Sequence, residues 1–200
     1  MATVKKTGAT SVKVAKPKFI FATLLTKGSG GEYEKSDTTY QFEHVLRDST
    51  SLTQDENTTN AIENEVSDEA IMQNVTLGAW QFTSTIEDIQ KDLVKDMCGF
   101  TVDGEKAYAP ASYTERFAEV AVVLDAGTDA EGEQKYVAYV VPKLQLNTRL
   151  ILESLSTSMA GFTLAGTAQS TEMTITGSKT VSSPMYIDMD YTLPTAGVGG

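Results

Sequence analysis

The chain of 200 residues is long enough to bury the core of one large β domain or of two small ones. With 40% hydrophobic and 22% charged residues, and no apolar run near the roughly 18 residues of a membrane span, its composition favours a soluble globular protein without a membrane partner. The net charge of −11 argues against tight binding to a nucleic-acid backbone, which requires a basic face.

The charge is unevenly distributed along the chain. Residues 1–31 contain six lysines and no acid, whereas residues 32–200 contain the other ten basic residues and all 27 acidic ones. A basic segment on an acidic body suits association between copies of the chain. The alternative interpretation is a solvated acidic surface with a floppy lysine-rich tail.

The N-terminal segment is too polar to form part of a core. We interpret residues 1–17 as an extended arm, residues 18–191 as a single β-rich domain and residues 192–200 as a flexible tail. Two strands are predicted after the arm, over Phe19–Thr26 and Tyr40–Leu46. The candidate contact residues of the arm are its lysines Lys5, Lys6, Lys13 and Lys16.

The next segment, residues 48–70, contains seven acids, no base and few apolar side chains. A connection of this length without evident structure is usually functional or disordered. We weigh a mobile surface excursion against an extended loop that reaches a neighbouring subunit. In the second interpretation the contact residues would be Asp55, Glu56, Asn57, Glu63, Glu65 and Asp68.

The segment from Ser84 to Phe100 carries the only strong helical pattern. Ser84 followed by Glu87 predicts an N-terminal capping box, and Gly99 a left-handed stop. Charged side chains fill one side of the predicted helix. We therefore expect a helix over residues 84–98 whose packing face is Ile86, Ile89, Leu93 and Met97.

The remaining segments favour strands. Asp103-Gly104 predicts a short hairpin, and the runs 117–124 and 135–141 predict a second one with a longer loop. Further strands are expected within 71–83, 144–152, 159–168, 172–176 and 185–191. The predicted fold is mainly β, a β-sandwich or barrel of about eight to ten strands with one flanking α-helix.

The sequence offers little for catalysis. His44 is a single histidine in a predicted strand, and Cys98 lies in the last turn of the predicted helix rather than at a helix N-terminus, where its pKa would be lowered. Asp188 and Asp190 share one face of the last strand without a third metal ligand in view, so an acidic pair facing a lumen or solvent is favoured. We expect no enzymatic activity, no metal and no cofactor.

Three blocks of the sequence resemble the major tail, or tail tube, proteins of long-tailed bacteriophages. They are residues 78–100, with GAWQFTSTIEDIQKDLVKDMCGF, residues 102–123, around KAYAPASYTERFAEVAVV, and residues 141–168, ending in MAGFTLAGTA. Together these blocks cover under half of the chain.

The resemblance implies a virion protein of the tail, assembled in the host bacterial cytoplasm. Six subunits would close a ring, and rings would stack into a tube through which DNA passes without specific binding. The partners implied are other copies of the chain and the tail terminator, tape measure and baseplate or tip proteins. The acidic loop would reach an adjacent ring, the lysine arm would make a second inter-ring contact, and the acidic body would line the lumen.

Two other classes remain open at the level of sequence. One is another head–tail structural protein, such as a terminator, connector or decoration protein. The other is a β-sandwich binding module, for which Trp80, Tyr108 and Tyr113 are the candidate aromatic cluster.

Overall fold

The computed structural model describes residues 17–43, 45–46, 48–64, 67–87, 91–147, 149–151, 161–175 and 178–194, with only the backbone described within 60–74 and 149–151. Strands dominate these ranges. The elements are β1 (Pro17–Lys27), β2 (Tyr33–Phe42), β3 (Ser51–Gln54), β4 (Thr58–Asn64), β5 (Ser67–Thr76), β6 (Trp80–Ile86), α1 (Lys91–Cys98), β7 (Thr101–Asp103), β8 (Lys106–Tyr108), β9 (Phe117–Thr128), β10 (Gln134–Leu146), β11 (Arg149–Ile151), β12 (Gly161–Ala168), β13 (Thr171–Ile175), β14 (Lys179–Ser183) and β15 (Tyr186–Asp188).

Nine strands form one antiparallel sheet. Its order is β2-β1-β9-β10-β12-β6-β3, with β15 added on β10 and β11 on β12. Within the described ranges β2 and β3 lie at the two ends of this path and do not pair with each other, so the sheet is open rather than a closed barrel. Three separate hairpins, β4–β5, β7–β8 and β13–β14, extend from it. The predicted mainly β fold with one flanking helix is confirmed.

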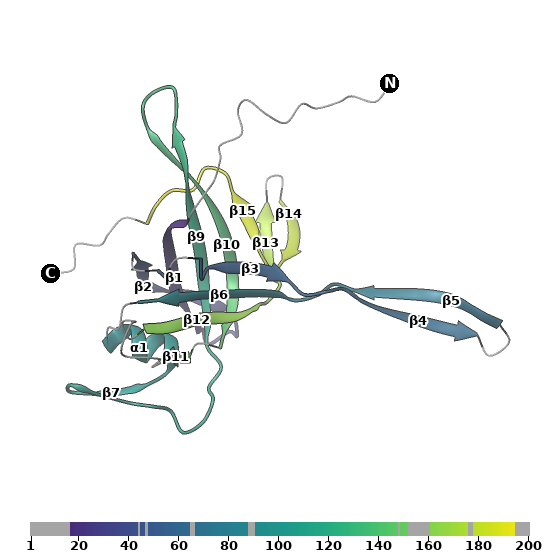
Figure 1. Cartoon of the computed structure of the whole chain (residues 1–200), viewed down its shortest axis with the longest axis horizontal. Coiled ribbons are helices and arrows are strands. Elements are labelled where there is room, and N and C mark those ends of the chain that lie inside the picture. The colour runs from purple at the N-terminus through teal and green to yellow at the C-terminus, as the bar shows by residue number, and fades with distance from the viewer. Residues whose placement is uncertain are drawn as a thin grey trace.

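The long sheet folds over on itself into two layers, and β10 is the strand that turns the corner. One edge of β10 pairs with β9, while its other edge is shared by β15 at residues 138–140 and β12 at residues 144–146. The register with β9 shifts between Val141 and Leu144, around Pro142, which cannot donate a ladder hydrogen bond. The strands β3, β6 and β12 consequently cross β9 and β10 at a steep angle (Figure 1).

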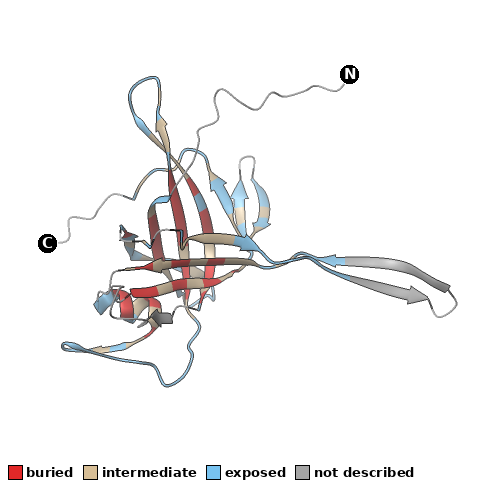
Figure 2. Ribbon diagram, viewed as in Figure 1, coloured by how far each residue is buried: buried red, intermediate tan, exposed pale blue. Residues whose placement is uncertain are grey.

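The main core lies between the two layers and under the helix. Buried side chains from β1, β2, β6, α1, β9, β10 and β12 meet there, and Figure 2 shows the red segments concentrated where the layers cross. The largest fully buried side chains of this cluster include Phe82, Phe162, Ile20, Ile86, Leu93, Met97, Leu144 and Leu164. At roughly 1.5–3 kcal/mol for each large side chain removed from water, this cluster is the main source of stability.

A second, smaller core covers the opposite face of β1, β9 and β10. Phe21, Ala121, Val123, Ala138 and Val140 form it, and the C-terminal segment packs over it through partly buried Tyr191 and Leu193. The Tyr191 N–H donates to the Tyr136 carbonyl at 3.0 Å. Because both faces of these central strands are covered, β9 is apolar over residues 117–124 with the exception of Glu119.

The helix is shorter than expected. The predicted capping residue, Ser84, is instead fully buried in β6, where its hydroxyl hydrogen-bonds to that of Thr50 at 3.0 Å. Ile86 is also in β6, whereas Leu93 and Met97 are on α1, and all three join the main core. Ile89 lies outside the described residues. The predicted stop is confirmed: Gly99 has φ +78° and donates to the Lys95 carbonyl at 3.0 Å.

The acidic segment 48–70 is also more regular than expected, because it contains β3, β4 and the start of β5. β3 joins the main sheet, and β4 pairs with β5 in a long hairpin. Other boundaries differ as well. The second strand was predicted over residues 40–46 and covers residues 33–42 in the structure. The strand β14 was not predicted.

Candidate assembly surface

The β4–β5 hairpin is the most unusual feature of the molecule. It projects from the body along the longest axis (Figure 1), and in the described part of the chain neither strand pairs with a third one. The longer strand has ten residues, which gives a reach of about 33 Å at roughly 3.3 Å per residue. An isolated two-stranded hairpin is only marginally stable in water. A hairpin of this length would gain stability from packing against a further surface.

The neck of the hairpin, residues 55–57 and 77–79, is held by a compact set of hydrogen bonds. The Asp55 N–H donates to the Ala79 carbonyl at 2.8 Å, and Gln81 Nε2 donates to Asp55 Oδ2 at 3.0 Å. The Gly78 N–H donates to Asn57 Oδ1 at 3.0 Å. A Cβ on Gly78 would overlap the Asp55 carbonyl, so only glycine permits this close approach.

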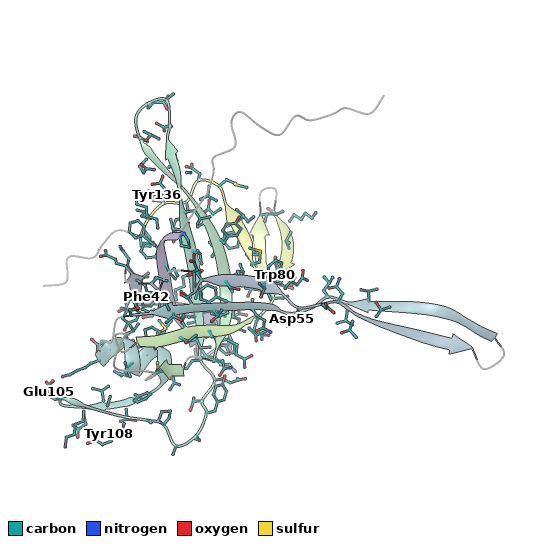
Figure 3. The ribbon with its side chains drawn as sticks, viewed as in Figure 1. Phe42, Asp55, Trp80, Glu105, Tyr108 and Tyr136 are labelled. Carbon is teal, nitrogen blue, oxygen red and sulfur yellow. The ribbon has the colours of Figure 1, made fainter. Side chains whose placement is uncertain are left out.

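Apolar side chains are exposed where the hairpin leaves the neck. Val75 is 53% exposed and Leu77 is 72% exposed, and a single residue stands between them, so they project on the same side of an extended chain. Figure 3 shows the neck, marked by Asp55 and Trp80, at the point where the hairpin departs from the sheet. Burial of these side chains against a second molecule would stabilise the contact.

The structure divides the six predicted loop residues into two groups. Asp55, Glu56 and Asn57 lie at the neck, where Asp55 and Asn57 hold the hairpin to the body. Glu63 lies on β4 and Asp68 on β5, farther out along the hairpin, and Glu65 falls outside the described residues. The importance of Gly78 was missed, although its interruption of an apolar alternation was the signal that could have revealed it.

The other predicted residues are not brought together with the hairpin. Asp188 lies on β15, and its Oδ1 accepts from the Asp190 N–H at 3.1 Å, so this pair shapes the turn after the strand. The lysines Lys5, Lys6, Lys13 and Lys16, together with His44, lie outside the described residues.

Two ends of the main sheet offer further surface for association. In the described residues β2 pairs only with β1, and β3 pairs only with β6. Each therefore presents one edge of unpaired backbone donors and acceptors, which can extend the sheet into another chain. Charged side chains along β2, such as Lys35 and Asp37, make indiscriminate pairing unfavourable and so favour a matched partner edge.

Cys98 is the nucleophilic side chain that the sequence analysis considered, and the structure places it at the end of α1. Burial raises the pKa of the Cys98 thiol to about 11, despite the opposing charge of Arg116, so the thiol is protonated at neutral pH. No group of three or more potential metal-ligating side chains occurs among the residues whose side chains are described.

A binding module would group its exposed aromatic side chains on one face. The three candidates, Trp80, Tyr108 and Tyr113, lie on separate elements of the structure. Trp80 lies at the start of β6, next to the hairpin neck, and packs partly against the main core, while Tyr108 lies on the β7–β8 hairpin, at the lower left of Figure 3. The Tyr113 hydroxyl donates to the carbonyl of Leu146, the last residue of β10, at 3.3 Å.

Across the ranges described, no helix has the length and apolar character needed to cross a membrane. No family model and no curated protein matches the sequence. Among solved structures, the chain is similar to one in the six-fold symmetrised cryo-EM structure of the anti-feeding prophage baseplate, with 9% identity, a TM-score of 0.38 and coverage of 92% of this chain and 97% of that one. No function is transferred from a likeness this distant.

Proposed function

We propose that this chain is a structural virion protein whose copies assemble into rings, six in each, that stack into a phage tail tube. The observation that carries the proposal is the β4–β5 hairpin, which extends from the body without a third strand of its own chain among the described residues. The resemblance of three sequence blocks to tail tube proteins is the reason for proposing a tail tube as the assembled structure.

The two open sheet edges fit the closing of a ring. A subunit that offers one edge at β2 and a different edge at β3 can pair head to tail with identical neighbours, and such contacts close a ring when the rotation between copies permits. Closure would pair these two edges and so shield them from unrelated chains. Stacking of rings would then fall to the hairpin and to the lysine-rich arm.

The charge suits a conduit for DNA. An acidic lumen repels phosphate groups, so a genome can slide along it without binding. In this proposal the chain performs no enzymatic reaction, binds no cofactor, and contacts tail terminator, tape measure and baseplate or tip proteins at the ends of the tube.

Negative-stain electron microscopy of the purified protein over a concentration series tests this function. Hollow tubes of stacked rings are the expected result. Isolated rings that never stack would instead favour a terminator or connector, which is the alternative compatible with the same fold. Monomers at every concentration, also after addition of preformed tube ends as seeds, would contradict self-assembly.

A further inference from the structure

A cleft of about 570 Å³ lies on the body, where the end of β1 and the starts of β2 and β9 meet the C-terminal end of α1. Its aromatic lining is formed by Tyr33, Phe100 and Phe117. Its basic side chains are Lys27, Lys95 and Arg116, of which Lys27 and Lys95 are exposed and Arg116 is half-buried.

The lining of this cleft carries more positive than negative charge, because it contains three basic side chains and two acidic ones. None of its three basic side chains forms a salt bridge with any residue in the described ranges. The two acids of the cleft accept hydrogen bonds from neutral donors rather than from these bases: Asp96 accepts from the Tyr40 hydroxyl at 2.7 Å, and Glu115 accepts from Gln145 Nε2 at 2.9 Å. Such a cluster of bases is conspicuous in a protein with a net charge of −11.

A fourth cation, Lys143, contacts two of the aromatic side chains that line the cleft. Lys143 Nζ lies 3.9 Å from the ring centroid of Tyr33 and 4.7 Å from that of Phe117. The two rings are packed edge to face at 4.9 Å, so the lysine is held over a rigid aromatic pair that lines the cleft. The site therefore combines positive charge with apolar surface, and it suits an acidic segment with some apolar character.

The hairpin and the cleft lie at opposite ends of the molecule. The elements that line the cleft, β1, β2 and α1, lie on one side of the body, and the β4–β5 hairpin extends away from the other side (Figure 1). The hairpin thus points away from the cleft of its own chain. A contact between the two features requires a second copy, and such a contact is head to tail.

We propose that the cleft receives the acidic end of the β4–β5 hairpin from a second copy of the chain. Residues 63–69 contain four acids and no base, which complements the cations of the cleft. This assignment rests on the proposed self-assembly and names the surface that receives the hairpin. The cleft orients the incoming strands by charge, and the aromatic side chains cover them, so the hairpin gains the packing that two strands lack alone.

Charge reversal provides the first test. Lys27→Glu with Lys95→Glu should weaken assembly at least tenfold, about 1.4 kcal/mol, because the cleft then repels the hairpin. The matched control, Lys106→Glu with Lys179→Glu, reverses two exposed lysines outside the cleft and should assemble as wild type.

The substitutions Glu63→Lys, Glu65→Lys, Asp68→Lys and Glu69→Lys together reverse the charge of the hairpin. This variant alone should fail to assemble, because its hairpin is repelled by the basic cleft. Combined in one chain with the reversed cleft, or mixed with the chain that carries the reversed cleft alone, it should restore assembly.

Disulfide trapping provides a test that does not depend on tubes. One chain carries Lys95→Cys and a second carries Asp68→Cys, each with Cys98→Ser so that a single thiol remains. Oxidation of the mixture should give a linked dimer that neither chain gives at the same yield alone. A third chain with Lys16→Cys tests the lysine arm as the alternative receptor for the hairpin.

The outcomes separate this inference from the proposed function. Linked dimers from the Lys95→Cys and Asp68→Cys chains, when the wild-type protein forms no tubes, would support the hairpin–cleft contact and contradict the tube. Tubes that persist with the reversed cleft, or the absence of a disulfide between these two chains, would overturn the contact and leave the tube standing. Trapping of the Asp68→Cys chain by the Lys16→Cys chain instead of the Lys95→Cys chain would also overturn it.

Discussion

Single residues set the direction of the hairpin. Asp55 and Asn57 hold the neck through their hydrogen bonds, and Gly78 lets the two chain segments approach so closely that a side chain would meet the Asp55 carbonyl. A long hairpin amplifies any change of angle at its base. The residues that determine where its end lies are therefore Asp55, Asn57 and Gly78 at the neck.

Gly78→Ala should lower the free energy of unfolding by about 1–3 kcal/mol, because the new methyl group forces backbone atoms of the neck apart. It should also reduce tube assembly, since the hairpin no longer points at its receiving surface. Chemical denaturation and electron microscopy measure the two effects. Gly30→Ala is the matched control, because a Cβ there meets nothing within 4 Å. Equal behaviour of the two variants would refute the role of the neck.

Tyr191 links stability to pH. Burial raises the pKa of its phenol from an ordinary 10.0 to about 12, and the charge of Glu119 adds to this. Because the raised pKa belongs to the folded state, the stabilisation is complete below pH 10. It is lost as the pH rises towards 12, where the unfolded chain ionises first.

We expect the free energy of unfolding to fall between pH 10 and pH 12, and Tyr191→Phe to make this fall shallower. Urea denaturation at intervals of pH measures both. Tyr40 and Tyr186 have raised pKa values too, so part of the slope should remain in the variant. An identical slope in wild type and variant would show that Tyr191 does not keep its proton on the folded surface.

At the scale of elements, the body and the hairpin are separable. The core clusters draw on the main sheet and α1, and β4 and β5 form their own two-stranded sheet. β3, in contrast, belongs to the body, because it pairs with β6 along residues 51–54. A deletion that tests the hairpin must therefore leave β3 in place.

Removal of residues 58–76, with a short glycine linker between Asn57 and Leu77, should leave a folded body that forms no stacked tubes. Circular dichroism and thermal unfolding should show the sheet intact, because no strand of the main sheet is lost. Electron microscopy should show single rings or monomers. Tubes of normal length from this deletion would exclude the hairpin from inter-ring contact.

At the scale of the whole molecule, the separation of charge is the main feature. A basic N-terminal segment, an acidic hairpin and a basic cleft within an acidic body are complementary between copies. Head-to-tail contacts of this kind build closed rings or open stacks rather than simple dimers. The strength of each contact depends on ionic strength, because much of the charge is exposed.

The substitutions Lys5→Glu, Lys6→Glu, Lys13→Glu and Lys16→Glu together should weaken the stacking of rings. The effect should be largest at low salt, because charges are screened least there: the Debye length is about 30 Å at 0.01 M. Sedimentation of tubes at several salt concentrations measures the loss. The variant with arginine at the same four positions retains the charge and is the control. Wild-type yield from the glutamate variant at low salt would mean that the arm takes no part in stacking.

The sequence by itself determined the fold class and much of the central sheet. β1, β9, β10 and β12 are apolar runs with turn residues between them, and the Asp103-Gly104 hairpin and the Gly99 stop follow from local backbone preferences. These features are predictable because each depends on a short stretch of chain. The separation of basic and acidic segments is likewise a property of the sequence alone.

Tertiary structure decided the rest, because the deciding contacts join distant residues. Residues 84–86 fit a helical stripe, yet their pairing with residues 162–164 of β12 makes them a strand. The acidic segment has too few apolar side chains to indicate a strand, and its hairpin follows from cross-strand pairing with β5. The neck and the basic cleft exist only once elements far apart in sequence meet, so no local pattern could have revealed them.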